Sequence, residues 1–491
     1  MSEESAESYG LKERIGFVAG LALIAIMLLL PPPASMTLTA WRVAAVGLLM
    51  AVWWMTEAVP IAVAALLPLA LFPLLGATTF REAAEPFAQS PIYLYMGGFM
   101  IAIAAERWGL HRRVALGIVS AIGTNPPLIV GGFMVATAFI SMWVSNTATA
   151  LMMIPMGRAI VELSAEQRGD AASNNTNDKN FSAALMLGIT YASSIGGMGT
   201  LIGTPPNAIF AGFVQETLKT QVNFLSWMLI GVPMILALLP LAWLVIVKGV
   251  CPVSSEGGAG SKETIRQQQR GLGKMSTGEL IVAIVFVLTS MLWIAEPFLR
   301  EAVPAFKLTD AGIAMCGALV LFLIPMNFSK GEFVLTWSDM KKLPWGVLIL
   351  FGGGLSLSQA IGKSGLAKWL GEAMQVMSVL PAWLIVLIVI TMIVFFSEVA
   401  SNAATVATFL PIVAALAPQV GVNTYTLLIA ATLAGSCGFM LPVATPPNTI
   451  AYATGYISTA QMARAGIWLN LISIALILLL CYTLVPLVFA P

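Results

Sequence analysis

The sequence reads Ser145-Asn146-Thr147-Ala148-Thr149 inside one apolar stretch, and it reads Ser401-Asn402-Ala403-Ala404-Thr405 inside another, at an offset of 256 residues. Pro155 and Pro411 repeat at the same offset. A polar cluster in the middle of an apolar helix would break it, and a broken helix cannot face lipid because its freed backbone groups need partners. These two stretches therefore decide the fold.

Two further pairs of motifs accompany the Ser-Asn clusters in the same order. Gly97-Gly98 and Gly352-Gly353 lie upstream of them. The runs Gly196 to Asn207 and Gly438 to Asn448 lie downstream, and each ends in Thr-Pro-Pro-Asn. Three ordered pairs favour an internal duplication over chance similarity among apolar helices.

The composition places the whole chain in a membrane. Apolar residues make up 58% of it and charged residues 10%, whereas a soluble domain is about a quarter charged. Stretches of about 20 apolar residues, enough to span a bilayer, recur from Ile15 onward. The net charge of +1 gives no indication of nucleic-acid binding.

The sequence predicts an all-α polytopic protein with about eleven transmembrane helices. The expected spans are 15–31, 39–57, 59–76, 91–110, 182–217, 224–248, 278–297, 310–327, 344–365, 424–457 and 463–489. Segments 126–165 and 381–417, which hold the Ser-Asn clusters, are expected to be re-entrant hairpins with half-depth arms. Spans 182–217 and 424–457 carry the Gly-rich and Pro-rich runs and are expected to be broken helices.

The predicted organisation is two inverted repeats. Residues 1–38 form the tail and first span, 39–250 the first repeat, 251–277 a cytoplasmic linker and 278–491 the second repeat. Five expected spans separate the two hairpin tips, so the hairpins would enter from opposite faces. Most of the 24 lysines and arginines fall on one side of this arrangement, which predicts a cytoplasmic N-terminus and an outside C-terminus in a bacterial inner membrane.

The clusters contain Ser, Thr and Asn but no Lys, Arg or His. Their oxygens can coordinate a hard cation and their N–H groups can donate to a carboxylate. Broken helices that meet inside the bilayer are a recurrent design of carriers, with anions at helix N-termini and sodium at unwound carbonyls. Two sodium ions could neutralise a dianion. Simple capping of the hairpin arms is the structural alternative, and the two roles are compatible.

Three other ionisable residues are ambiguous. Glu57 and Glu398 lie in apolar sequence, where an ionisable side chain is a candidate functional residue, but we favour a structural role in which each accepts bonds from nearby backbone. His111, the one histidine, is interpreted as an interfacial residue at the end of a span.

Several of these motifs together resemble the divalent anion/sodium symporter family. They are Trp54 to Ile61, the Ser-Asn-Thr of the first hairpin, Ser397-Glu398 before the second Ser-Asn, and both Thr-Pro-Pro-Asn loops. The resemblance covers nearly the whole chain. It implies a homodimer in which a transport part slides as an elevator against a scaffold, with sodium as the coupling ion and no other cofactor.

The resemblance also implies site residues. One sodium ion would use Ser141, Ser145, Asn146 and Gly203, and a second would use Ser397, Ala400, Asn402 and Ala444. The carboxylates of the substrate would meet Asn146, Thr147, Thr204, Asn402, Ala403, Thr445 and Pro446. Ala403 is a departure, because many family members have a threonine there, and it puts the inherited substrate preference in doubt.

The leading hypothesis is a symporter that imports C4-dicarboxylates with sodium. A sodium-independent dicarboxylate or citrate exchanger, and a sulfate or tricarboxylate symporter, remain open. A channel is a further alternative, because pores also use re-entrant loops. An enzyme is not expected, because a single peripheral histidine offers neither a nucleophile with its base nor a metal site.

Overall fold

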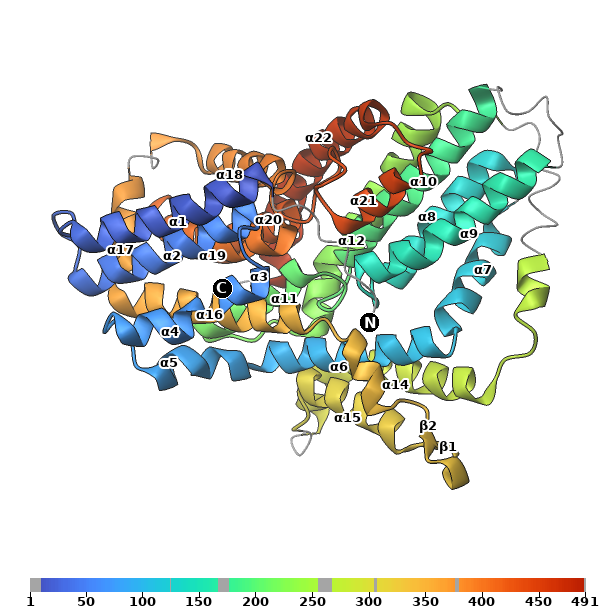
Figure 1. Cartoon of the computed structure of the whole chain (residues 1–491), viewed down its shortest axis with the longest axis horizontal. Helices are drawn as coiled ribbons and strands as arrows, with labels where there is room; N and C mark the ends of the chain where they lie inside the picture. The colour runs from blue at the N-terminus through green and yellow to red at the C-terminus, as the bar shows by residue number, and fades with distance from the viewer. Residues whose placement is uncertain are drawn as a thin grey trace. The chain divides into compact units, whose positions relative to one another are not determined.

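The computed structural model describes residues 10–123, 125–166, 176–254, 267–303, 307–375 and 379–489. Nearly all of their regular structure is helical (Figure 1). The chain divides into two compact units, each built from segments of both predicted repeats. Most of the N-terminal tail and the centre of the predicted linker 251–277 lie outside the described residues, and the repeat boundaries stay a prediction.

The first unit comprises Met1–Ile92, Ala208–Gln221 and Pro344–Gly435. Its helices are α1 (Leu11–Leu29), α2 (Leu38–Thr56), α3 (Ile61–Ala65), α4 (Leu67–Leu74), α5 (Phe80–Ala84), η1 (Glu85–Ala88), α16 (Trp345–Ser364), α17 (Leu366–Met374), α18 (Ala382–Ser397), α19 (Asn402–Gln419) and α20 (Thr424–Ala434). The core lies around α16, which packs against α2, α3 and η1. Gly353 allows this packing, because a Cβ there would lie 2.1 Å from the Ala65 carbonyl oxygen.

The second unit comprises Tyr93–Asn207, Val222–Leu343 and Ser436–Pro491. It contains α6 (Ser90–Arg107), α7 (Leu110–Ile122), α8 (Pro126–Ser141), α9 (Asn146–Glu166), α10 (Thr176–Gly197), α12 (Phe224–Leu244), the π-helical turn η3 (Val245–Val250), α14 (Thr277–Ala302), α15 (Asp310–Leu323), η4 (Phe328–Lys330), η5 (Trp337–Lys342), α21 (Pro446–Ala453), α22 (Thr459–Thr483) and α23 (Val485–Val488). Helix α11 (Pro205–Thr217) begins here and continues into the first unit.

Helix α10 is the centre of the second unit. Every residue from Phe181 to Gly197 is buried, as expected for a helix that is apolar on all sides. Helices α8, α9, α12 and α21 pack around it, and Figure 1 shows α8, α9 and α10 running side by side. The polar residues of α10 therefore face protein rather than lipid.

Fewer helices than expected are long and apolar enough to cross a bilayer alone. Among the described residues six pass that criterion: Leu38–Thr56, Phe224–Val250, Thr277–Ala302, Trp345–Ser364, Asn402–Gln419 and Thr459–Val488. A seventh is the pair Phe80–Ala88 and Ser90–Arg107, bent by 41°. Expected spans such as 59–76 and 310–327 consist of shorter apolar helices. The multi-span helical character is confirmed, and the count of eleven stays a prediction.

Helical structure is interrupted within both of the spans that were expected to be broken. The first stops at Gly197, at the end of α10, and resumes at Pro205, the start of α11. The second stops at Ala434, at the end of α20, and resumes at Pro446, the start of α21. Proline suits the first turn of a helix because the N–H that it lacks would have no partner there. The Thr-Pro-Pro-Asn motifs therefore restart both helices.

Both hairpins are helical and turn at the Ser-Asn clusters. Helices α8 and α9 form the first and α18 and α19 the second. The arms have 16, 21, 16 and 18 residues, or about 24 to 32 Å at 1.5 Å per residue. They are longer than the half-depth arms expected from the sequence, because α9 extends to Glu166 and α19 to Gln419.

A small sheet corrects the all-α expectation. Strands β1 (Pro325–Asn327) and β2 (Glu332–Phe333) pair antiparallel, with Pro325 opposite Phe333. Gly331, with φ of 65°, adopts the left-handed conformation in the connecting turn, which costs glycine little.

A further repeated feature was not anticipated. Gly109 and Gly365, again 256 residues apart, have φ of 76° and 82° and precede α7 and α17. Both helices are short and amphipathic. In α7 the buried residues Ala115, Leu116 and Val119 lie on one face. A glycine with left-handed backbone therefore follows each helix that holds a Gly-Gly pair, α6 or α16, and precedes the short helix before each hairpin.

Candidate functional site

The tip of the first hairpin is shaped by its own polar residues. Helix α8 ends at Ser141 and α9 begins at Asn146. The Ser145 hydroxyl accepts a hydrogen bond from the Ala148 backbone N–H at 3.3 Å, and the Ser145 carbonyl accepts one from the Thr149 N–H at 2.9 Å. Ser145 therefore caps the second arm.

Three oxygen atoms converge behind this tip. Ser141 Oγ lies 2.9 Å from Asn146 Oδ1 and 2.6 Å from the Ser193 carbonyl oxygen on α10. The hydroxyl has one proton, so it can satisfy only one of these two acceptors at a time. Oxygen ligands in excess of donors are what a hard cation prefers. The arrangement can coordinate sodium.

Two glycines let the backbone approach this cluster. A Cβ at Gly197 would lie 2.3 Å from Asn146 Oδ1, and a Cβ at Gly203 would lie 2.4 Å from the Gly197 carbonyl oxygen. Neither contact is compatible with a side chain. The interrupted segment after α10 is therefore in direct contact with the tip of the first hairpin.

The two Thr-Pro-Pro-Asn asparagines make equivalent hydrogen bonds. Asn207 Nδ2 donates to the carbonyls of Gly197 at 3.0 Å and Thr200 at 2.7 Å. Asn448 Nδ2 donates to the carbonyls of Gly438 at 3.2 Å and Leu441 at 2.9 Å. All acceptors correspond at the motif offset of 241 residues. Each side-chain amide thus holds the interrupted segment of its own helix. We call this pair of hydrogen bonds the asparagine brace.

The helices that restart after the braces offer N-terminal N–H groups. Thr204 and Thr445 stand immediately before α11 and α21 and are 2% and 5% exposed. Thr445 Oγ1 accepts from the Asn448 N–H at 3.4 Å. A helix N-terminus attracts anions through its free N–H groups and its dipole. In the second unit α21 packs against α9 and α10, so the Thr445 helix is a neighbour of the first hairpin.

The tip of the second hairpin belongs to the first unit and is bonded differently. The Ser397 hydroxyl donates to the Val394 carbonyl at 2.9 Å within its own helix. Asn402 Oδ1 and Thr405 Oγ1 are buried and have no hydrogen-bond partner in the described part of the chain. An unpaired buried acceptor is costly, so the Asn402 oxygen is suited to receive a ligand.

The residues of the first predicted sodium site lie together in one unit, whereas those of the second are divided between the two units. Ser141, Ser145, Asn146 and Gly203 lie in one unit around one tip. Thr147 and Thr204 belong to the same unit. Ser397, Ala400, Asn402 and Ala403 belong to the first unit, whereas Ala444, Thr445 and Pro446 belong to the second. The roles of both sets stay predictions.

The ambiguous acids have different environments. Glu398 is 4% exposed at the end of α18, and its structural role stays a prediction. Glu57 is exposed and has a left-handed backbone with φ of 53° after α2. Its carboxylate accepts no hydrogen bond within the described residues, so the expected backbone bonds are not found.

Sequence reasoning missed Ser193, whose carbonyl completes the oxygen cluster. The Thr-Pro-Pro-Asn motifs were recognised in the sequence, but the hydrogen bonds of their asparagines were not predicted. The signal for Ser193 was the run Ser193-Ser194 in an otherwise apolar span next to Gly196-Gly197. For the braces, it was an asparagine immediately after a helix restart.

Helical hairpins and broken helices in a multi-span chain are typical of membrane carriers. Residues 11–490 match the family described as the sodium:sulfate symporter transmembrane region, and the chain belongs to this family of transporters.

Relatives of similar sequence agree with this assignment, and two solved structures have a similar fold. The sodium-dependent dicarboxylate transporter SdcS of Staphylococcus saprophyticus is 42% identical over 488 residues, covering 99% of this chain and 94% of that protein. SdcS of Staphylococcus aureus is 42% identical over 476 residues, covering 96% of this chain and 91% of that protein. The fold is similar to Alcanivorax borkumensis YdaH (TM-score 0.58, 12% identity, covering 96% of this chain and 98% of that chain) and to Neisseria gonorrhoeae MtrF (0.60, 12%, 96% and 95%).

Proposed function

We propose that this protein imports C4-dicarboxylates such as succinate, malate or fumarate together with sodium ions. The observation that carries the proposal is the convergence of Ser141 Oγ, Asn146 Oδ1 and the Ser193 carbonyl oxygen at the first hairpin tip. Relatives that are 42% identical over nearly the whole chain are named sodium-dependent dicarboxylate transporters, which supports the choice of both solutes.

The first sodium ion is coordinated by Ser141, Ser145, Asn146 and Gly203, to which we add the Ser193 carbonyl. A second is coordinated by Ser397, Ala400, Asn402 and Ala444. The unpartnered Asn402 Oδ1 supports the second site. Sodium at both positions supplies the positive charge that the Ser-Asn clusters themselves lack.

The dicarboxylate lies between the two sodium ions. Its contacts are Asn146, Thr147, Thr204, Asn402, Ala403, Thr445 and Pro446. The side-chain amides donate to the carboxylates, and the restarted helices direct their N-termini at the negative charge. Ala403 contributes no hydroxyl, so one carboxylate is held by fewer donors than the other.

Transport proceeds by an elevator movement in a homodimer, with the N-terminus in the cytoplasm and the C-terminus outside. The family resemblance supports the dimer and the movement, and the distribution of lysine and arginine supports the orientation.

Uptake of labelled succinate into proteoliposomes tests the function. We expect an inward sodium gradient to stimulate uptake that saturates with succinate and shows counterflow, whereas potassium in place of sodium abolishes it. Uptake without sodium would instead identify an exchanger, and flux that neither saturates nor shows counterflow would identify a channel.

Sulfate is the second candidate substrate, because the family description names it. Competition by unlabelled sulfate and citrate in the same assay separates these substrates. If sulfate competes better than succinate, the dicarboxylate assignment is wrong while sodium coupling stands.

A further inference from the structure

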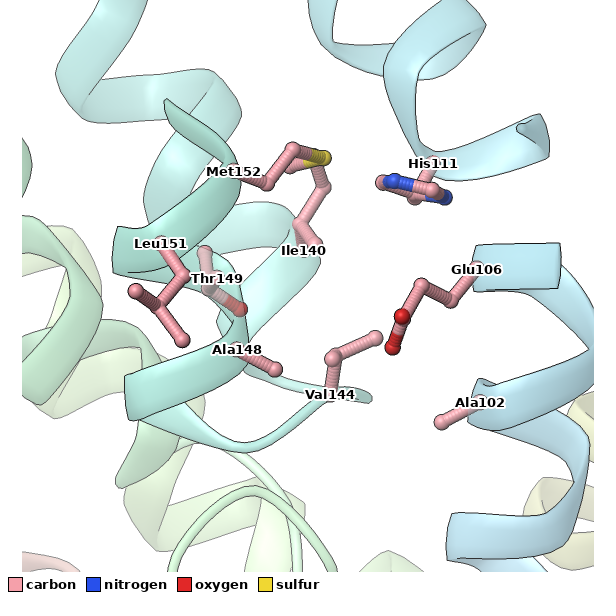
Figure 2. A pocket seen from close by; sticks show the side chains of 9 residues that line it. All are labelled: Ala102, Glu106, His111, Ile140, Val144, Ala148, Thr149, Leu151 and Met152. Atoms are coloured by element: carbon pink, nitrogen blue, oxygen red, sulfur yellow. The ribbon is translucent and has the colours of Figure 1, made fainter. Parts of the chain in front are cut away.

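A pocket of about 260 Å³ lies beside the first hairpin, within the second unit (Figure 2). One wall belongs to the hairpin and is largely apolar, formed by Ile140, Val144, Ala148, Leu151 and Met152. The opposite wall is the corner between α6 and α7. Ligand sites are typically apolar concavities with a few polar groups that fix orientation.

Thr149 contributes a buried hydroxyl to the apolar wall. The residue is 1% exposed, and Oγ1 has no hydrogen-bond partner among the described residues. Figure 2 shows the hydroxyl oxygen directed toward the pocket. A buried polar group without a partner is unfavourable, so a ligand that accepts or donates here would be stabilised.

His111 lies at the rim, opposite Met152 (Figure 2). Its Nδ1 is 2.8 Å from the Ala105 carbonyl oxygen, and a carbonyl can only accept, so Nδ1 carries a proton. Burial lowers the pKa of His111 below its ordinary value, against the opposing effect of the Ala105 carbonyl and Glu106. In the neutral ring Nε2 is therefore an acceptor.

Glu106 directs its carboxylate toward Val144 from the end of α6 (Figure 2). Lys342 donates to its Oε1 at 2.7 Å, and the two side chains are 54% and 42% exposed, so solvent weakens the ion pair. Arg112 is a second nearby cation that acts on His111. The polar end of the pocket thus offers a carboxylate that accepts hydrogen bonds from a neutral donor and disfavours an anion.

We propose that this pocket binds a small uncharged amphipathic molecule that carries a hydroxyl group, of the size of a substituted benzyl alcohol. The hydroxyl donates to the Glu106 carboxylate and accepts from Thr149, and the apolar body packs against the hairpin wall. A carboxylate is excluded by repulsion from Glu106, which separates this site from the dicarboxylate site. Because Val144 and Ala148 flank Ser145 to Thr147, an occupant holds the hairpin tip against α6.

Photolabelling of the purified full-length protein tests the proposal without requiring transport. The probe is a trifluoromethyl-diazirinyl benzyl alcohol, and its matched control is the same diazirine with a methyl group in place of the hydroxymethyl group. We expect the alcohol to label the segment 140–152 about fiftyfold more than the methyl compound does, because the methyl compound makes neither of the two hydrogen bonds, which are worth about fivefold for Thr149 and about tenfold for the charged Glu106. Excess benzyl alcohol should displace it, and excess benzoate should not.

Two substitutions locate the labelling. Ala102→Phe fills the pocket from the α6 side and should abolish labelling of 140–152, whereas Thr149→Val removes one polar partner and should reduce it about fivefold. Thr137→Val is the matched control, because Thr137 is also buried with an unpartnered hydroxyl on the same hairpin but does not line the pocket. It should label like the unaltered protein.

Equal labelling of 140–152 by both probes, or labelling unchanged in Thr149→Val, would overturn the proposal. If Ala102→Phe does not yield folded protein, Ala102→Leu replaces it. Sodium-stimulated succinate uptake by the same preparation reports separately on the transport function, so failure of one proposal is distinguishable from failure of the other.

Discussion

The two asparagine braces are alike, whereas the two hairpin tips are not. Asn207 and Asn448 donate to carbonyls at corresponding positions. At the tips, Ser141 reaches across to Asn146 and Ser193, but Ser397 bonds back within its own helix and Asn402 Oδ1 is left without a partner. The hydrogen bonds that hold the backbone at the two breaks are equivalent, whereas those at the two hairpin tips differ.

The largest effect is expected from removing the amide at either tip. Asn146→Ala and Asn402→Ala should each reduce sodium-driven succinate uptake about a hundredfold, because a contact to a charged group is worth up to about 3 kcal/mol. Asn180→Ala is the control, since Asn180 donates to the Pro252 carbonyl far from either tip in sequence. Unaltered uptake by both tip variants would refute the site assignment.

Gly203→Ala should have the next largest effect. The new Cβ would lie 2.4 Å from the Gly197 carbonyl oxygen, and forced overpacking costs about 1 to 3 kcal/mol. We expect lower sodium affinity in uptake titrations and a lower thermal midpoint. Gly362→Ala is the control, because nothing lies within 4 Å of a Cβ there. Equal behaviour of the two variants would contradict the close approach.

The braces allow a test of equivalence. Asn207→Ala and Asn448→Ala each remove a buried amide that makes two hydrogen bonds. Each should lower the free energy of unfolding by about 2 kcal/mol. Thermal unfolding of both variants in detergent measures this. A loss confined to one of them would show that the braces are not equivalent.

The smallest change is Ala403→Thr, which would make the second tip read Ser-Asn-Thr like the first. One added hydrogen bond to a carboxylate should lower the KM for succinate about tenfold, the lower end of the range for a bond to a charged group, with little change in the maximal rate. Ala404→Thr, one position on, is the matched control. An unchanged KM in a folded Ala403→Thr protein would place Ala403 away from the substrate.

The sequence located the breaks in the helices well because their causes are local. Proline and glycine end a helix through their own backbone chemistry, so α11 and α21 begin at Pro205 and Pro446, inside the motifs from which they were predicted. The hairpin turns likewise lie at the polar clusters, and at the first of them Ser145 caps the second arm.

Features that depend on contacts between residues far apart in the sequence could not be predicted from it. Ser193 joins Ser141 across 52 residues, and no local pattern specifies that approach. Composition alone does not determine the number of spans. An apolar stretch such as 59–76 has the composition of one span but divides into α3 and α4. The short strands at Pro325 and Glu332 lack a periodic pattern long enough to detect.

The asparagine brace also bears on how much the sequence of a broken segment can vary. Both asparagines donate only to main-chain carbonyls, so the side chains within each break are unconstrained by the bond. The first break reads Met198-Gly199-Thr200 and the second Phe439-Met440-Leu441, yet both accept the same amide in the same place. An amide that bonds only to the backbone lets two loops of different sequence make the same hydrogen bonds.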